Sequence, residues 1–169
     1  QYTPQSFCQS LGLNLDDYVT ITSYTHHPMW SKFAVEVQDN WRWPLSYNVP
    51  MEDICKIIDN AVNNGYTVAW GGDVTEDGFT RKGLGIAYDV KKVRSMAGTD
   101  ADHWFKLSKD EKKEKFDSLG VNAPEIVPTQ AMRQEAFDNW ETTDDNGMHI
   151  YGIDKDQNGK EYYMVKKSW

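Results

Sequence analysis

The chain has 169 residues, of which 39% are apolar and 13% aromatic, and its formal net charge is −8. This length is typical of one domain or of a large part of one, and seven tryptophans and nine tyrosines need a core or a partner surface, which argues against disorder. The acidic balance, without a block of Lys or Arg, excludes nucleic acids and anionic membranes as expected partners.

The first fifty residues alternate between short predicted elements and loops. Thr3 followed by Pro4 is typical of a helix N-terminus, and a glycine at position 12 marks the end of that helix. β-Branched and aromatic residues predict strands, whereas polar runs with proline predict loops. We therefore expect strands at Tyr18–Tyr24 and Phe33–Val37, a loop at Thr25–Trp30, and irregular structure at Asp39–Pro50, which is too polar for a core strand.

The clearest helix of the sequence is Met51–Asn63. Its apolar residues fall at helical spacing, acidic residues occupy its first turn, and a glycine follows its end. The apolar stripe places Cys55 on the inner face, where an ordinary buried thiol is expected. Beyond this helix, Tyr66–Trp70 is predicted to be a short buried strand and Gly71–Gly85 a glycine-rich loop.

The carboxyl-terminal third predicts two helices and a β-hairpin. A serine N-cap and a glycine stop bound a charged, exposed helix at Ser108–Leu119. The next helix, Thr129–Trp140, is expected to turn Met132, Ala136, Phe137 and Trp140 inward, and strands at Met148–Ile153 and Glu161–Lys166 flank a polar turn. Because strands and helices do not alternate as in a doubly wound fold, we expect one α+β unit with a mainly antiparallel sheet and flanking helices.

The turn at Asp154–Lys160 resembles the beginning of a calcium-binding loop. Asp154, Asp156, Asn158 and Gly159 match positions 1, 3, 5 and 6 of an EF-hand. Position 12 should be a bidentate Glu but is Val165, and the flanking residues predict strands rather than helices. A plain polar hairpin is therefore favoured over a calcium site.

His26 and His27 are the other candidate metal ligands. Neighbouring side chains on an extended segment point in opposite directions, and no cysteine or acid stands at a supporting spacing. We interpret the two histidines as a structural pair in a loop, and the sequence predicts neither a metal site nor a bound cofactor.

Gly71, Gly72 and Asp73 follow a predicted strand. A pair of glycines permits unusual backbone angles or the close approach of another chain, and no GK[ST] motif follows to make a phosphate loop. The three residues are interpreted as a tight turn at the edge of a cleft and are the candidate substrate-binding residues.

Two stretches near the carboxyl terminus, DNGMHIYGI and MVKKSW, resemble the His and Asn regions of bleomycin hydrolase and aminopeptidase C, a branch of the papain-like cysteine peptidases. The upstream stretches LNLDDYVTITSYTHHP, DNWRWPLSYNVP and NNGYTVAWGGDV extend the resemblance over nearly the whole chain. The resemblance implies the carboxyl-terminal half of a papain-like cysteine peptidase fold, with residues 1–169 as a single partial peptidase domain. The part that carries the nucleophilic Cys in this family is absent from the chain.

The catalytic positions of the family are occupied by other residue types in this chain. The resemblance places the family's His at Asn146 and the Asn of its Asn-Ser-Trp motif at Lys167. His149 lies three residues after Asn146, and an odd offset in a strand turns it to the opposite face. Neither Cys8 nor Cys55 precedes a Trp as the family's nucleophile does, so the nucleophilic cysteine is absent.

These substitutions shape the expected function. The resemblance implies a cysteine-type aminopeptidase that is catalytically inactive here, as a fragment or a degenerate homologue. The alternative is a non-catalytic peptide-binding or interaction module, in which Gly71–Asp73 and the region of Trp41 and Trp43 hold an extended peptide. A subunit of a split enzyme is disfavoured, because Asn146 and Lys167 would still leave such a complex without its base.

The expected partners and location follow from the same resemblance. Peptides with a free amino terminus are the expected ligands, and self-association or a missing amino-terminal half would cover the aromatic surface. No apolar run approaches the roughly 18–20 residues of a membrane span, and no signal peptide is visible. The family resemblance implies a cytoplasmic location.

Overall fold

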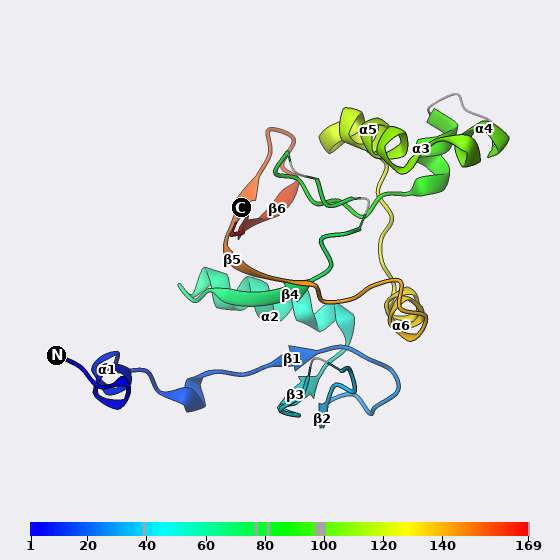
Figure 1. Ribbon diagram of the computed structural model, residues 1–169. Coiled ribbons are helices and arrows are strands. Elements are labelled where there is room, and N and C mark those ends of the chain that lie inside the picture. The colour runs from blue at the N-terminus through cyan, green and yellow to red at the C-terminus, as the bar shows by residue number, and fades with distance from the viewer. Residues whose placement is uncertain (39, 77, 81, 97–100, 169) are drawn as a thin grey trace. The chain divides into compact units, whose positions relative to one another are not determined.

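The computed structural model describes residues 1–169 except 39, 77, 81, 97–100 and 169. The chain divides into two compact units, an amino-terminal unit at Gln1–Ile57 and a carboxyl-terminal unit at Ile58–Trp169. The helices are α1 (Pro4–Ser10), α2 (Met51–Asn63), α3 (Val90–Met96), α4 (Ala101–Lys106), α5 (Lys109–Leu119) and α6 (Gln130–Asp138), as Figure 1 shows. The strands are β1 (Ile21–Thr22), β2 (Lys32–Ala34), β3 (Leu45–Asn48), β4 (Val68–Gly72), β5 (Asn146–Lys155) and β6 (Glu161–Lys166).

A three-stranded sheet in the order β1-β3-β2 organises the amino-terminal unit. The central strand β3 pairs in parallel with β1 and in an antiparallel direction with β2. The prediction of irregular structure at Asp39–Pro50 is therefore wrong for residues 45–48. The prediction failed because it took polar residues as evidence against a core strand. In β3 the polar Ser46 and Asn48 point inward, whereas Leu45 and Tyr47 are exposed.

Helix α1 begins as predicted, at Thr3 and Pro4. The Thr3 hydroxyl accepts a hydrogen bond from Ser6 N at 3.1 Å, and the Ser6 hydroxyl accepts one from Thr3 N at 2.8 Å. This reciprocal capping box satisfies two backbone donors that the first turn would otherwise leave without partners. Proline at the first helical position adds a preset φ angle.

Helix α2 has the predicted bounds and covers most of its predicted apolar face. Ile58 is buried and Ile54, Ala61 and Val62 are half-buried, whereas Ile57 and Cys55 are exposed. The expectation of a buried Cys55 thiol is wrong, because Cys55 lies at the margin of the covered stripe. Asp59 accepts a hydrogen bond from the Tyr163 hydroxyl at 2.7 Å and so links α2 to β6.

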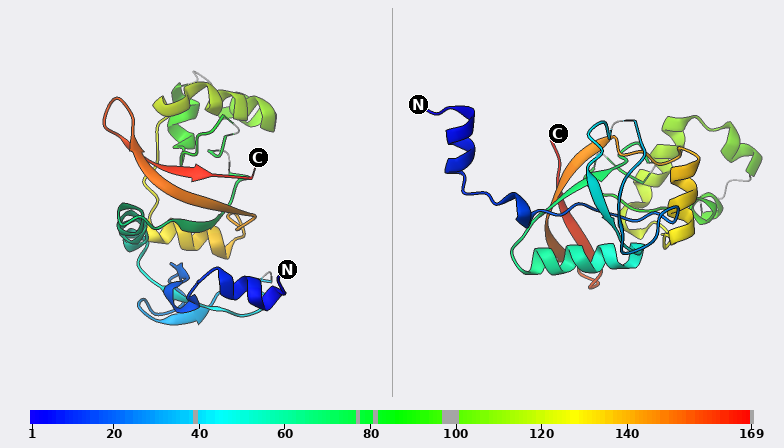
Figure 2. Two further views of the ribbon diagram at one scale, coloured as in Figure 1. Left: turned by 90° about the vertical axis from the view of Figure 1, so that its left-hand side faces the viewer. Right: turned by 90° about the horizontal axis from the view of Figure 1, so that it is seen from below.

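A second three-stranded sheet, in the order β4-β5-β6, is antiparallel throughout. Strands β5 and β6 form a long, twisted hairpin (Figure 2). Its turn has the predicted hairpin chemistry: Asp156 accepts backbone hydrogen bonds from Asn158 and Lys160 at 2.8 and 3.0 Å, and Gly159 adopts a φ of 82°. The hairpin is confirmed where a calcium loop was the alternative.

Strand β4 differs from its prediction in burial and in extent. It was expected to be buried, but its central residues 69–71 are exposed, and it runs on through Gly72. In the part of the chain that the structure describes, β4 pairs with β5 only. The strand therefore has one paired edge and one open edge.

A small hydrophobic core lies among α3, α4 and α5. Its buried residues are Ile86, Tyr88, Val93, Trp104, Phe116 and Ala123. The Tyr88 and Phe116 rings stack at 4.7 Å, and the Tyr88 hydroxyl donates to the Phe116 carbonyl. Helix α5 has the predicted N-cap, since the Ser108 hydroxyl accepts from Glu111 N at 3.2 Å.

Helix α6 is capped by Thr129, whose hydroxyl accepts a hydrogen bond from Met132 N at 3.2 Å, but its inward face differs from the prediction. Gln134 is buried, while Met132 and Trp140 are exposed. Trp140 also has a left-handed backbone, with a φ of 62°, as do Trp30 and Trp43 at 62° and 50°.

None of the helices in the described part of the chain has the length and apolar character that crossing a membrane requires.

Candidate functional site

The register of β4 and β5 brings predicted site residues from distant parts of the sequence together. Gly72 lies opposite Asn146, and Gly71 lies opposite Gly147. On the other side of β5, His149 pairs with Lys166, so Lys167 directly follows the ladder. One end of this sheet therefore carries both the predicted glycine pair and the two residues, Asn146 and Lys167, that the resemblance assigns to catalytic positions.

The faces of β5 separate Asn146 from His149. Met148 and Ile150 are buried and alternate with the exposed Gly147 and His149. Because side chains alternate along a strand, Asn146 shares the face of Met148 and Ile150. His149 points to the opposite face, as its odd offset from Asn146 predicts.

An open groove of about 530 Å³ crosses this sheet. We call it the β4–β6 groove, and its lining residues are Ala69, Trp70, Gly71, Gly147, Met148, His149, Lys166, Lys167 and Ser168. Of the predicted site residues, Gly71 and Lys167 line the groove, whereas Gly72, Asp73 and Asn146 are not among its lining. His149 lines it from the face opposite to Asn146.

The two glycines of β4 have different surroundings. A Cβ atom at Gly72 would come within 2.9 Å of two ring atoms of Trp70 and within 3.2 Å of the Met148 methyl group. A Cβ atom at Gly71 would come within 3.1 Å of an Asp144 carboxylate oxygen. Gly147, across from Gly71, has room, since a Cβ atom there would meet none of the described atoms within 4 Å. Gly72 is therefore required by the packing of its neighbours.

Asp73 joins the end of β4 to the segment that leads into β5. Its carboxylate accepts hydrogen bonds from Thr143 N at 3.0 Å and from the Thr75 N and hydroxyl at 2.7 and 2.6 Å. In return, Val74 N donates to the Asp145 carboxylate at 3.0 Å. Partial burial by itself would raise the pKa of the Asp73 carboxyl. The hydrogen-bond donors together have the larger effect, so the pKa lies below its ordinary value.

Lys167 follows β6 with its ammonium group packed over the Phe79 ring, 4.8 Å from the ring centre. Its Nζ atom is enclosed by the protein. Burial lowers the pKa of Lys167, and the nearby Asp145 carboxylate opposes that effect without cancelling it.

Both cysteines of the chain lie outside the β4–β6 groove. Cys8 is on α1 and Cys55 is on α2, and each is exposed. The groove lining contains neither of them.

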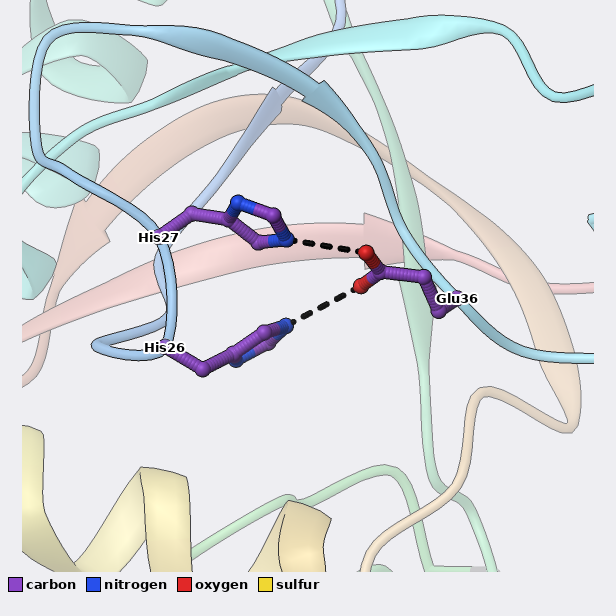
Figure 3. Close-up of side chains that lie close together, drawn as sticks. All are labelled: His26, His27 and Glu36. Carbon is purple, nitrogen blue, oxygen red and sulfur yellow. Dashed lines mark hydrogen bonds and ion pairs between the residues drawn. The ribbon is translucent and has the colours of Figure 1, made fainter.

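A second polar cluster lies in the amino-terminal unit, where His26 and His27 both face Glu36 (Figure 3). The expectation that the two imidazoles point apart is wrong, because residues 26 and 27 lie in a turn rather than in a strand. The sequence pattern also missed Glu36 as a supporting acid. The pairing of β2 with β3 brings it back beside the histidines, and spacing along the chain carries no signal of that.

Comparisons with known proteins agree on the fold. A family model described as the Peptidase C1-like family matches residues 1–169. Matching solved structures include the crystal structure of PepW from Lactobacillus rhamnosis HN001, which is 22% identical over the whole of this chain with a TM-score of 0.61. The chain covers 33% of PepW and so spans about a third of its length. No curated protein sequence matches.

The likeness to PepW concerns the fold alone at this identity. The predicted α+β class, with mainly antiparallel sheets and flanking helices, is confirmed. The partial single domain predicted for residues 1–169 remains a prediction.

Proposed function

Because the chain belongs to the Peptidase C1-like family, we propose that it is a cysteine-peptidase-type fold that does not hydrolyse peptides by itself. The observation that carries this proposal is the identity of two residues at one end of the β4-β5-β6 sheet. Asn146 stands where the resembling aminopeptidases have their His, and Lys167 stands where they have their Asn.

The chemistry of peptide hydrolysis explains why these residues matter. A cysteine peptidase needs a thiolate nucleophile, a base that takes and returns its proton, and a group that orients the base. The Asn146 amide cannot accept a proton near neutral pH. Lys167 in its charged form offers donors only, so it cannot accept a hydrogen bond from an imidazole. Neither Cys8 nor Cys55 lines the β4–β6 groove, so a nucleophile is also missing there.

Peptide binding is the activity that this surface supports. Strand β4 has an open edge in the described part of the chain, and an extended peptide can add to such an edge through backbone hydrogen bonds. The adjoining β4–β6 groove contains Gly147, whose missing side chain leaves room for another backbone to approach closely. The ligands expected from the resemblance are peptides with a free amino terminus.

The catalytic half of the proposal is tested with fluorogenic aminoacyl substrates. The purified chain, with its mass verified near 19.5 kDa, is assayed with and without a thiol-reactive inhibitor. We expect no inhibitor-sensitive turnover. Turnover that the inhibitor abolishes, in a sample with no second polypeptide, would show that a cysteine of this chain acts as the nucleophile and would overturn the proposal.

The binding half is tested by fluorescence polarisation with a peptide labelled at its carboxyl end. The free-amine peptide is expected to bind more tightly than its N-acetylated form. Equal binding of both peptides would remove the amino-terminal preference, and no binding of either would remove the peptide-binding function altogether. The catalytic assay is independent of this outcome.

A further inference from the structure

The loop between β1 and β2 places two imidazoles against one carboxylate. His26 Nε2 lies 3.2 Å from one carboxylate oxygen of Glu36, and His27 Nε2 lies 2.9 Å from the other (Figure 3). One potential ligand atom from each of the three residues lies within 4.8 Å of the other two. Two adjacent histidines therefore converge on a single point of the surface.

The separations suit a metal ion. Zinc binds imidazole nitrogen and carboxylate oxygen at about 2.0–2.2 Å, and tetrahedral bonds of that length place neighbouring ligand atoms about 3.3 Å apart. Each imidazole nitrogen lies within a few tenths of this value from one carboxylate oxygen, at 3.2 Å for His26 and 2.9 Å for His27. A set of one ligand atom from each residue lies within 4.8 Å, so a bound ion would draw these atoms closer together. Two histidines and one carboxylate are also the donor set of several known zinc and iron sites.

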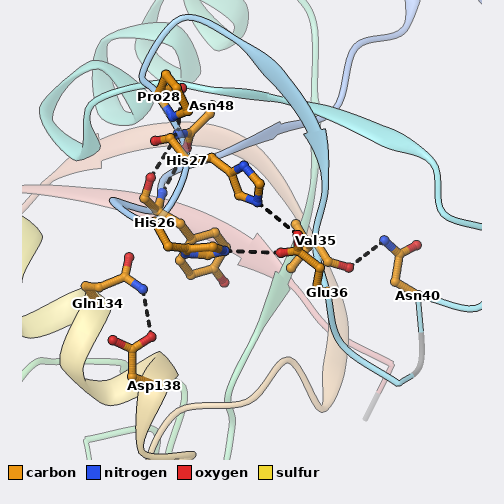
Figure 4. Close-up of polar contacts among 10 residues, drawn as sticks. His26, His27, Pro28, Val35, Glu36, Asn40, Asn48, Gln134 and Asp138 are labelled. Atoms are coloured by element: carbon orange, nitrogen blue, oxygen red, sulfur yellow. Dashed lines mark hydrogen bonds and ion pairs between the residues drawn. The ribbon is translucent and has the colours of Figure 1, made fainter.

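The side chain of Asn48 fixes the backbone of this loop (Figure 4). Asn48 is fully buried on β3, and its side-chain oxygen accepts from Tyr24 N at 2.8 Å. Its amide nitrogen donates to the carbonyls of Tyr24, His27 and Pro28 at 2.8, 3.0 and 3.1 Å. One side chain thus holds the backbone on both sides of His26, which reduces the ordering cost of binding an ion.

The imidazole rings are held by aromatic packing. The buried Phe33 ring stacks on His27 with centres 4.0 Å apart and meets His26 edge-on at 5.5 Å. The Tyr24 ring lies beside both rings, with its centre 5.6 Å from that of His26 and 6.5 Å from that of Phe33. Phe33 lies on β2, three residues before Glu36 in the chain. One short segment therefore supplies both the carboxylate and the support for the two rings.

The charge of the site also favours a cation. Glu36 supplies a carboxylate, which is an anion at neutral pH, beside the two imidazoles. All three side chains are partly exposed, which leaves room for water as a further ligand.

We propose that His26, His27 and Glu36 form a binding site for a divalent transition-metal ion of the zinc class. The ion would lie between the two Nε2 atoms and the carboxylate, and it would tie the β1–β2 loop to the segment after β2. This site is independent of the peptidase-type groove and of the function proposed for it.

The test is a calorimetric titration of the full chain with zinc chloride. One zinc ion per chain is expected to bind, and His26→Ala, His27→Ala and Glu36→Gln are each expected to weaken binding at least about tenfold. The matched control is His149→Ala, which removes an exposed histidine from the other unit and is expected to change the affinity by less than about twofold. Unchanged affinity in the three site variants, or stronger loss in the control, would overturn the proposal.

A second measurement uses the unaltered chain, so it does not depend on how any variant folds. Cobalt(II) bound by two imidazoles and a carboxylate in a tetrahedral site absorbs visible light, and zinc added afterwards should abolish the absorption. Magnesium, which prefers six oxygen ligands, should not compete. The absence of a zinc-displaceable cobalt band would contradict the proposed site.

Discussion

Gly72 and Asn146 are direct partners across the antiparallel ladder of β4 and β5. The first residue belongs to the glycine pair that the sequence indicates as a cleft edge, and the resemblance assigns the second to the position of the family's catalytic His. Because the two are paired in register, a ligand held along β4 would lie close to Asn146. Under the proposed function, a bound peptide would therefore lie beside the residue that replaces the base.

Filling the β4–β6 groove should abolish peptide binding without disturbing the fold. In Gly147→Leu, the new side chain has room at its Cβ position and projects into the groove. We expect the affinity for a free-amine peptide to fall at least about tenfold, which corresponds to about 1.4 kcal/mol. Fluorescence polarisation measures the affinity, and circular dichroism verifies the fold.

The control for this change is Tyr151→Leu, which places the same residue type at an exposed position on β5 outside the groove. Its peptide affinity should stay close to that of the unaltered chain. Equal losses in both variants would mean that the groove is not where the peptide binds.

Replacing Lys167 by Met should stabilise the chain at neutral pH. Because burial lowers the folded-state pKa of this lysine, its charged form is less favourable in the folded than in the unfolded chain. That penalty is present below the folded-state pKa and disappears as the pH rises towards the unfolded value of 10.5. We expect a higher urea midpoint for Lys167→Met at pH 7 and a smaller gain at pH 10, with the exposed neighbour Lys166→Met as control. A lower midpoint at pH 7 would show that the Phe79 and Asp145 contacts outweigh desolvation.

Asp73 should contribute to acid sensitivity. Its folded-state pKa lies below the ordinary value of 3.8, so its stabilising effect is present above pH 3.8 and is lost as the pH falls through the folded-state pKa. Asp73→Asn should therefore be less stable at pH 7 and should lose less stability than the unaltered chain between pH 6 and pH 3. Urea denaturation at both pH values measures this difference. Glu114→Gln, on the exposed side of α5, is the control, and parallel pH profiles for the unaltered chain and Asp73→Asn would contradict the prediction.

Asn48→Ala should destabilise the amino-terminal unit strongly. The substitution removes four hydrogen bonds and leaves buried backbone groups of the β1–β2 loop without their partner. A loss of about 2–4 kcal/mol is expected in urea denaturation. Asn63→Ala, at the exposed end of α2, should change stability by less than about 0.5 kcal/mol. A similarly small effect of Asn48→Ala would mean that water replaces the lost amide.

The exposed aromatic surface should drive self-association. Trp30, Trp41 and Trp43 are 68, 77 and 59% exposed in the amino-terminal unit, and exposed aromatic side chains are typical of surfaces that bind partners. We expect the average mass from light scattering to rise with protein concentration. A constant monomer mass at high concentration would contradict this expectation, and a triple Trp→Ser variant should shift the rise to higher concentration.

Local signals predicted the helices and the hairpin well. The caps at Thr3 and Ser108 and the spacing of Met51–Asn63 each depend on residues a few positions apart, so the sequence contains the whole interaction. The polar turn of the β5–β6 hairpin is local in the same sense. Such elements require no knowledge of distant partners.

The failures concern residues whose role depends on distant contacts. Strand β3 looked too polar for a core strand because the buried Asn48 has partners about twenty residues away. Strand β4 was expected to be buried because it is apolar. Its central residues 69–71 are exposed, and one of its edges is unpaired in the described part of the chain. Cys55 of α2 and Met132 and Trp140 of α6 were wrongly expected to be buried, because periodicity finds an apolar stripe but not how much of it packs.

The same contrast between local signals and distant contacts applies to the candidate sites. Asn146 and Lys167 could be assigned from resemblance, and the strand register then explained why Gly72 lies beside them. The third possible site, His26 with His27 and Glu36, was rejected on the sequence because the turn that aligns the two imidazoles is not visible in residue spacing. Trp169, which completes the Ser-Trp pair after Lys167, lies outside the described residues.

The open edge of β4 has a consequence for how affinity should be measured. A strand edge does not distinguish the backbone of a peptide ligand from that of a second copy of the same chain. If both use β4, the two equilibria are competitive, so the apparent peptide affinity should weaken as the protein concentration rises, and saturating peptide should dissolve the oligomers. Occupancy of this one strand would then link the assembly state of the protein to the supply of its ligand.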